Sequence, residues 1–333
     1  MKDIARDLGI SPMAVSKALR NHRDISAETK ARVLQRAAEL NYRVNMVARS
    51  MITGRTYLVG LVVPDLMQSF FSEVASSLSA ALAPAGYHVL ICNTNEDSRS
   101  EVENIELLVS RNIDGLVIAS AQRTTRMLST LTTPLVTVDR HIPQLNANYV
   151  GSDDEQIGVI ATEHLIDQGC RAIVHLAGTG ASPGRGRIAG FHRALKGRTN
   201  GSVDGRVVDA GYDSGSGYRA MKAFLDEGAR PDGIFCFNDP VAIGAMRAVA
   251  EAGLRIPQDV AIVGVANMQL TDMLQVPLTT VDQGTSAIGE RAAHLLLNEM
   301  GVEGASEPQH ILLPPRLIVR QSSNRRAPLA EAD

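Results

Sequence analysis

The sequence predicts a helix-turn-helix headpiece followed by an α/β core of two doubly wound lobes, each built on a parallel sheet. Three amphipathic helical patterns occupy the beginning of the chain. From Tyr57 onward, short β-branched runs alternate with longer amphipathic stretches, which is typical of parallel β-α folds. About ten such strands are too many for one modest sheet, and 333 residues exceed one ordinary hydrophobic core. We therefore expect two similar lobes.

The boundaries of the three headpiece helices follow from residues that start and stop helices. Gly9 can adopt the left-handed conformation that ends the first helix, and Pro12 suits the first position of the second, where its missing N–H would be unpaired. Ser26 is the predicted N-cap of the third helix. The apolar positions expected to pack between the helices are Ile4, Ala5, Leu8, Val15, Ala18, Leu19, Val33, Leu34, Ala37 and Leu40.

The core alternates predicted strands with predicted helices. The strands cover residues 57–63, 87–92, 114–120, 134–139, 171–178, 206–211, 232–238 and 260–266. The helices cover residues 70–85, 98–111, 124–131, 154–168, 185–197, 214–227 and 239–252. Ligands in such folds bind at the carboxyl ends of the strands, where the loops are free to carry polar side chains.

Charge is distributed unevenly along the chain. Residues 1–55 contain eleven Lys and Arg against five Asp and Glu, whereas the remainder contains twenty-two against thirty-one. A basic N-terminal piece on an acidic body indicates that the small piece approaches a polyanion. A solvated helical surface would explain the same charge, so this observation needs the support of a motif.

Neither a membrane span nor a secretory signal is predicted. No apolar run reaches the roughly 18–20 residues that a bilayer requires, and the N-terminal stretch MKDIARDLGI is charged and amphipathic. Cys92, Cys170 and Cys236 form no CxxC pair, which favours buried free thiols over disulfides or a metal site. These features predict a cytoplasmic protein, and no cofactor or metal is expected.

The helix-turn-helix is the strongest functional feature. Such a unit places its second helix in the major groove, with N-terminal side chains against base edges. Lys17 could reach guanine acceptors, and Met13 could touch a thymine methyl group. A plain three-helix bundle is the alternative for this segment alone. The residues expected to contact DNA are Ser11, Pro12, Met13, Ser16 and Lys17.

A series of longer motifs runs through the whole chain. The headpiece carries DIARDLGISPMAVSKAL, ISAETKARVLQRAAELNY and VNMVARSM. The core carries DGLVIAS, GRIAGF, SGYRAMKAFL, FCFNDPVAIGAMRA, GLRIPQDVAIVG and LTTVDQ. In these motifs and their order, nearly all of residues 2–320 resembles the LacI/GalR (lactose repressor) family of transcription regulators. The resemblance implies a periplasmic-binding-protein-like core behind a DNA-binding headpiece.

The resemblance also implies how the chain is divided. The expected parts are the headpiece (1–43), a hinge helix and linker (44–55), an N-terminal lobe (56–152 and 283–313), a C-terminal lobe (153–282 and 314–325) and a tail (326–333). The tail lacks the sustained leucine heptads of a tetramerising coil. A homodimer is therefore the expected assembly.

In the family, the segment after the position of Tyr42 is a hinge that folds on the operator, where two copies enter the minor groove. Asn45 and Arg49 match its helix-capping and phosphate-proximal positions. Met51 stands where the family usually inserts a leucine between base pairs, and a flexible methionine could still act as the apolar wedge. Val44 replaces the usual proline, so ordering the hinge is expected to cost more. Tyr42, Asn45, Arg49 and Met51 are further DNA-binding candidates.

For the core, the resemblance implies an effector cleft between the lobes. The implied residues are Phe70, Phe71, Asp139, Arg140, Arg187, Tyr212, Asn238, Asp239 and Gln283. Arginine suits a carboxylate or several hydroxyls, and an aromatic suits a ring face. Asp239 could equally be a helix N-cap. Ala266 stands where the family commonly carries an effector-binding aspartate, so Asn267 substitutes for it, or the ligand differs from the usual sugars, or sensing is weakened.

The sequence thus predicts a non-enzymatic transcription regulator, a repressor, that binds a palindromic DNA operator as a homodimer. A small polar effector (a sugar, sugar acid or related metabolite) is expected to switch it, and whether the effector induces or corepresses stays open. The alternatives are a solute-binding protein or a sugar-related enzyme of similar two-lobed fold. GASPG at 180–184 matches a serine-nucleophile elbow, but Pro183 lacks the backbone N–H that the oxyanion hole needs.

Overall fold

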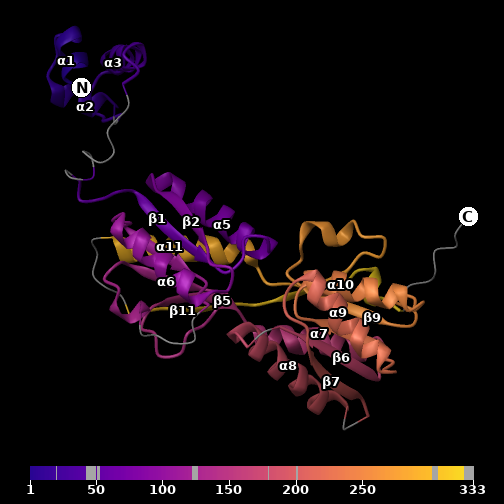
Figure 1. The fold of residues 1–333 in the computed structure, drawn as a ribbon. Coiled ribbons are helices and arrows are strands. Elements are labelled where there is room, and N and C mark those ends of the chain that lie inside the picture. Colours follow the sequence, from indigo (N-terminus) through magenta and orange to yellow (C-terminus); the bar gives the residue numbers. More distant parts are fainter. Residues whose placement is uncertain are drawn as a thin grey trace, which may run out of the picture. The chain divides into compact units, whose positions relative to one another are not determined.

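A computed structural model of the chain describes residues 1–19, 21–42, 50, 53–121, 127–178, 180–199, 202–301 and 307–325. Contacts divide the chain into two units, Met1–Thr56 and Tyr57–Asp333 (Figure 1). The first contains the headpiece and the second contains the core. Among the described residues, no helix combines the length and apolarity needed to cross a bilayer.

The first unit contains the three predicted helices: α1 (Lys2–Leu8), α2 (Pro12–Leu19) and α3 (Ala27–Glu39). α1 ends as predicted at Gly9, which has a φ of 64° in the left-handed region. Ser26 caps α3, since its side chain accepts a hydrogen bond from the backbone N–H of Thr29. These details confirm the start and stop signals of the sequence.

A small apolar core holds the headpiece together. Its buried members are Ile4, Ala5, Val15, Ala18, Val33 and Ala37. The predictions for Leu34 and Leu40 are wrong, since these side chains are 54% and 40% exposed. Val33 and Ala37 lie four residues apart and share one face of α3, whereas Leu34 lies about 100° further round the helix. Leu40 is the C-cap residue, past the last turn that faces the core.

The first lobe of the second unit is built on a six-stranded parallel sheet with the order β11-β5-β4-β3-β1-β2. The strands are β1 (Leu58–Val63), β2 (His88–Asn93), β3 (Gly115–Ile118), β4 (Leu135–Val138), β5 (Asn148–Ser152) and β11 (His310–Leu313). Helices α5 (Ser69–Leu82) and α11 (Thr285–Met300) pack on one face, and α6 (Ser98–Ser110) packs on the other (Figure 1). The central strands are covered on both faces, which explains their continuous apolar runs.

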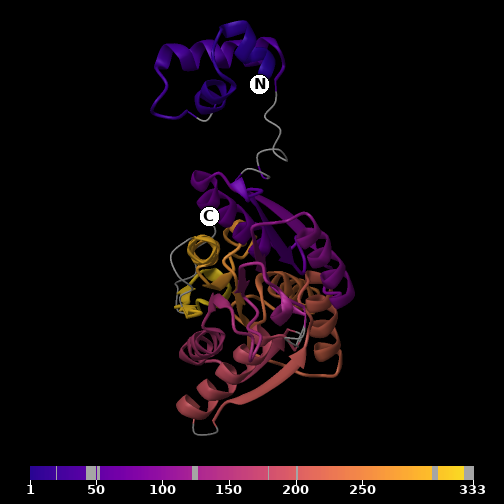
Figure 2. The same ribbon diagram turned by 90° about the vertical axis from the view of Figure 1, so that its left-hand side faces the viewer.

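The second lobe repeats this architecture with the order β12-β10-β9-β8-β6-β7. The strands are β6 (Ala172–Ala177), β7 (Asp204–Asp209), β8 (Gly233–Cys236), β9 (Ala261–Val265), β10 (Thr279–Asp282) and β12 (Arg316–Ile318), of which β12 is antiparallel to β10. Helices α9 (Ser214–Asp226) and α10 (Asp239–Glu251) pack on one face, and α7 (Asp154–Asp167) and α8 (Ser182–Thr199) pack on the other (Figure 2). Two doubly wound lobes are therefore confirmed.

Three local predictions need correction. α5 ends at Leu82 rather than at residue 85, because the chain continues as a separate 3-10 turn, Ala83–Ala85, which contains Pro84. Of the predicted helix 124–131, residues 124–126 lie outside the described residues, and the rest contains a single 3-10 turn, Leu128–Thr130. The cysteines are free as predicted, but Cys92 is half-buried rather than buried, because β2 is an edge strand.

In the described part of the chain, three segments cross between the lobes: from β5 to α7, from β10 to α11, and from β11 to β12. The Ser152 hydroxyl donates to the carbonyl oxygen of Gln283 over 2.7 Å. The backbone N–H of Asp153 donates to the carbonyl oxygen of Leu313 over 3.2 Å. These bonds tie the three crossovers side by side at the base of the region between the lobes.

Candidate functional site

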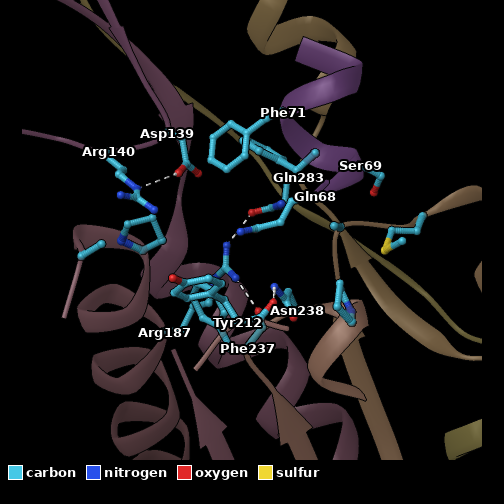
Figure 3. Close-up of a pocket in the computed structure, with 16 residues that line it drawn as sticks. Gln68, Ser69, Phe71, Asp139, Arg140, Arg187, Tyr212, Phe237, Asn238 and Gln283 are labelled. Carbon is cyan, nitrogen blue, oxygen red and sulfur yellow. Dashed lines mark hydrogen bonds and ion pairs between the residues drawn. The ribbon is translucent and has the colours of Figure 1, made fainter. Parts of the chain in front are cut away.

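A cleft opens between the two lobes of the second unit, at the carboxyl ends of their strands (Figure 3). The space between its walls amounts to about 600 Å³ when the part open to solvent at its mouth is included. Most of the predicted effector residues line it: Phe70, Phe71, Asp139, Arg140, Arg187, Tyr212, Asn238 and Gln283. Asp239 is the exception.

Each lining side chain is placed by the end of a strand or by the start of the next helix. Asp139 follows β4, Asn238 follows β8 and Gln283 follows β10. Phe70 lies in the first turn of α5, and Arg187 lies near the start of α8. Because the central strands of each sheet are parallel, their carboxyl ends meet at one edge, which brings these distant residues together.

Arg187 is at the centre of the cleft's polar contacts, although only 3% of it is exposed. Its Nε donates to Oδ1 of Asp154 over 3.0 Å, and its Nη1 donates to the carbonyl oxygen of Phe237. Its Nη2 donates to Oε1 of Gln283 over 2.5 Å (Figure 3). The guanidinium also lies over the Phe237 ring, 4.6 Å from the centroid. Burial raises the pKa of Asp154, and the Arg187 charge opposes that rise.

Arg140 and Asp139 form the opposite wall. Arg140 binds Glu96 through two hydrogen bonds, Nη1 to Oε2 over 2.7 Å and Nη2 to Oε1 over 2.5 Å. Its Nε is 3.9 Å from Oδ2 of Asp139. No described residue donates a hydrogen bond to the Asp139 carboxyl, and burial, together with the charge of Asp154, raises its pKa to about 7. The Asp139 carboxyl group can therefore accept a hydrogen bond from a ligand in the cleft.

Asp239 does not line the cleft, and it is not the cap of α10 either. Asn238 is the cap, since its Oδ1 accepts from the Val241 N–H over 2.9 Å. The buried Asp239 carboxylate accepts from the Thr280 hydroxyl over 2.6 Å and from the Met268 N–H over 2.9 Å. Burial raises its pKa to about 6. Asp239 thus fixes the loop after β9 from behind the cleft.

That loop contains the position where the family commonly has an aspartate. Ala266 lines the cleft and has a φ of 118°, an unusual value for a residue with a side chain. Asn267 turns away from the cleft, because its Oδ1 accepts from Nη2 of Arg320 over 2.8 Å and its Nδ2 approaches Asp282. In this structure Asn267 does not substitute for the missing carboxylate.

Several lining residues were not predicted from the sequence: Gln68, Ser69, Ala181, Pro183, Phe237, Pro240 and Met268. Phe237 directly follows β8, so its place at a strand end was a usable signal. Met268 depends on the loop that Asp239 anchors, which no local motif indicates. Ser182, the serine of the elbow-like motif, accepts a hydrogen bond from the backbone N–H of His141 in the other lobe over 2.9 Å. This motif therefore contributes a contact between the lobes.

In the headpiece, the predicted DNA-reading residues lie along the outer side of α2. Ser11, Pro12 and Met13 are exposed, and Ser16 and Lys17 are partly exposed. Ser11 also caps the helix, since its Oγ accepts from the Ala14 N–H over 3.1 Å. These side chains are available to a groove of DNA.

The predicted hinge contacts are only partly described. Tyr42 is half-buried and packs against the headpiece core, and its N–H donates to the carbonyl oxygen of Ala37 over 2.8 Å. Val44, Asn45, Arg49 and Met51 lie outside the described residues and stay predictions.

Comparison with known proteins agrees with both units. Residues 1–45 match the family described as bacterial regulatory proteins, lacI family, and residues 162–323 match the periplasmic binding protein-like domain. The ribose operon repressor of Halalkalibacterium halodurans is 31% identical over 97% of this chain and 96% of its own length. The transcriptional repressor PurR of Pasteurella multocida is 30% identical over 98% of this chain and 99% of its own.

Solved structures give the same result. The lac repressor dimer bound to operator and the anti-inducer ONPF is 25% identical, with a TM-score of 0.83 over 96% of this chain and 98% of its own. A LacI family regulator from Enterococcus faecium with bound ribose is 26% identical, with a TM-score of 0.71 over 80% of this chain and 98% of its own. A helix-turn-helix headpiece on a two-lobed ligand-binding core defines a DNA-binding transcription repressor, a class without catalytic activity. The chain belongs to the LacI family of bacterial regulatory proteins.

Proposed function

We propose that this repressor binds a palindromic operator as a homodimer and that a small polar effector in the cleft changes its affinity for DNA. The contact that best supports the effector site is the bond from Arg187 to Gln283. Gln283 lies on a crossover between the lobes, so a ligand that engages Arg187 acts directly on the junction of the lobes. By this proposal the chain works in the cytoplasm, beside the bacterial chromosome.

Homodimerisation follows from the size of the headpiece. One reading helix contacts only a few base pairs, so adequate specificity needs two half-sites and a symmetric pair of headpieces. The lac repressor structure named above is a dimer on its operator, and this chain is similar to that protein over nearly its whole length. Ser11, Pro12, Met13, Ser16 and Lys17 are the proposed base-reading residues, with Tyr42, Asn45, Arg49 and Met51 contacting DNA near the hinge.

The charges of the cleft favour an uncharged effector over a sugar acid. Arg187 is paired with Asp154, and Arg140 is paired with Glu96. Each cation among the described lining residues has a carboxylate partner, whereas the carboxyl group of Asp139 accepts no hydrogen bond from a described residue. A hydroxyl group can donate to Asp139 and accept from the remaining N–H groups of Arg187. We therefore propose a polyhydroxy compound, and the ribose found in the Enterococcus faecium regulator is of that kind.

The proposed switch has two states. Effector binding between the lobes changes their relative angle, which changes the spacing of the two hinge segments across the dimer and hence their ability to fold in the minor groove. Only a ligand that prefers one state shifts the equilibrium. Induction and corepression both fit this scheme, and they differ only in which state the effector binds more tightly.

Selection of DNA from a random duplex library by the purified full-length chain tests the function. We expect enrichment of a sequence with two-fold symmetry and a stoichiometry of two chains per duplex, measured by sedimentation. A solute-binding protein or an enzyme of the same fold would enrich no sequence. Failure to enrich any duplex would therefore contradict the proposal.

A further inference from the structure

We infer that Asp24 is a specificity-determining residue of the headpiece, which acts by holding the ammonium group of Lys17. Nζ of Lys17 donates to Oδ2 of Asp24 over 3.1 Å. The inference rests on the proposed function, in which Lys17 reads base edges. Asp24 is a positioning residue, since the contact with DNA is made through Lys17.

The local fold brings these two residues together. Asn21 has a φ of 54°, and its N–H donates to the carbonyl oxygen of Ala18. The N–H of His22 donates to the carbonyl oxygen of Lys17. These two bonds form a Schellman-type end to α2, which reverses the chain and returns it past the last turn of the helix. Asp24 is thereby placed against Lys17, seven residues earlier in the chain.

The segment between α2 and α3 is also held by contacts with α3. Nζ of Lys30, in α3, donates to the carbonyl oxygen of Asn21 over 3.4 Å. Ser26, two residues after Asp24, is held as the cap of α3. Asp24 therefore sits on a short segment tied to both helices, which gives its carboxylate a defined position beside the reading helix.

The Asp24 carboxylate also lies close to a second basic side chain. The same Oδ2 lies 3.3 Å from Nδ1 of His22. The hydrogen bond from Lys17 and the charge of His22 hold the pKa of Asp24 below its usual range. Asp24 is therefore ionised at neutral pH, and the carboxylate offsets much of the attraction that Lys17 would exert on a distant phosphate.

The consequence for DNA binding differs between specific and non-specific sites. Non-specific binding depends on lysines that swing freely to any phosphate, and a lysine held by Asp24 must leave its partner to do so. At the correct sequence the held ammonium is already placed, so its remaining N–H groups can meet guanine acceptors at a smaller loss of side-chain entropy. Asp24 thus lowers non-specific affinity more than specific affinity. The pair is exposed at the surface, which limits the expected effect to a few fold.

Asp24→Asn tests the inference with the full-length chain. The probes are a duplex chosen by the selection experiment and a scrambled duplex of the same composition. We expect Asp24→Asn to bind the scrambled duplex more tightly and to lower the ratio of specific to non-specific affinity about two- to fivefold. The dependence of scrambled-duplex binding on salt should steepen by about one phosphate contact, because Lys17 is released. Asp24→Glu should largely restore the wild-type ratio.

Two further variants separate a positioning role from a simple change of charge. Asp3→Asn removes the same charge from α1, where Asp3 pairs with Arg6. It should change the affinities for the selected and the scrambled duplex by the same factor. In a Lys17→Ala background, Asp24→Asn should leave the ratio unchanged. The inference would be overturned if Asp24→Asn alone left the ratio of specific to non-specific affinity unchanged. It would also be overturned if Asp24→Asn lowered this ratio equally in the Lys17→Ala background. If the library yields no preferred duplex, the proposed function itself fails, which is a distinct result.

Discussion

The guanidinium of Arg187 and the side-chain amide of Gln283 join two parts of the fold, with Nη2 of Arg187 2.5 Å from Oε1 of Gln283. Arg187 comes from α8 of the second lobe, and Gln283 lies on the crossover that leads into α11 of the first lobe. Since α11 packs against α5 in the core of the first lobe, one side chain of the cleft is linked to both lobes.

Arg187→Ala should abolish the response to effector while leaving operator binding intact. It should also destabilise the core by about 3–5 kcal/mol, because Asp154 would be buried without its partner. Denaturant unfolding measures the second effect, and fluorescence anisotropy with operator DNA, with and without effector, measures the first. A response that persists in this variant would place the effector elsewhere.

Asp139→Asn should change the way stability depends on pH. With a pKa of about 7, Asp139 binds more protons in the folded chain than in the unfolded chain between about pH 4 and pH 7. The contribution of Asp139 to the free energy of unfolding is therefore complete below about pH 4 and is lost as the pH rises to about 7. Asparagine cannot ionise, so the variant should be as stable as wild type near pH 4 and more stable at pH 8, by up to about 4 kcal/mol. Denaturant titrations at several pH values measure this, and a difference that is constant with pH would contradict it.

Ala266→Gly should stabilise the core rather than weaken it. The φ of 118° at Ala266 is costly for a residue with a Cβ and is accessible to glycine. We expect a gain of roughly 1 kcal/mol in the free energy of unfolding. Ala250→Gly, at an exposed position in α10, is the control and should show the ordinary loss of about 0.5–1 kcal/mol. Equal losses in both variants would show that the backbone at Ala266 is not strained.

Lys17→Ala should weaken binding to the selected operator by about 1–3 kcal/mol and binding to scrambled DNA by much less. Competition binding with both duplexes in one buffer provides the comparison. An equal loss on both would mean that Lys17 contacts phosphate alone.

The sequence predicts the architecture well because its signals are local. Gly9, Pro12 and Ser26 mark helix ends by their own backbone and side-chain chemistry. Alternation of strands and helices predicts parallel sheets. Leu34 shows the limit of such signals. A small three-helix unit buries only a narrow face of each helix, so an apolar residue beside that face, such as Leu34, stays exposed.

The cleft was predictable mainly where polar residues lie just beyond the ends of strands, as Asp139 and Asn238 do. Asp239 was misplaced and the role of Asn267 was left open, because their partners are distant in the sequence. Asp239 binds Thr280 and Met268, and Asn267 binds Arg320, 53 residues away. The spacing of residues in the sequence does not indicate whether such a side chain points into the cleft or binds a residue of a neighbouring loop. For the same reason, no local motif indicates the pair of Lys17 and Asp24, which forms because the chain reverses after the end of α2.

The central claim is that a ligand in the cleft controls operator affinity. The most direct test measures operator affinity of the wild-type chain across a titration of a polyhydroxy compound that raises the melting temperature of the core. The account predicts a change of roughly fivefold or more, with its midpoint at the concentration that half-saturates the cleft and with no change in Arg187→Ala. Constant operator affinity while the cleft is saturated would contradict it.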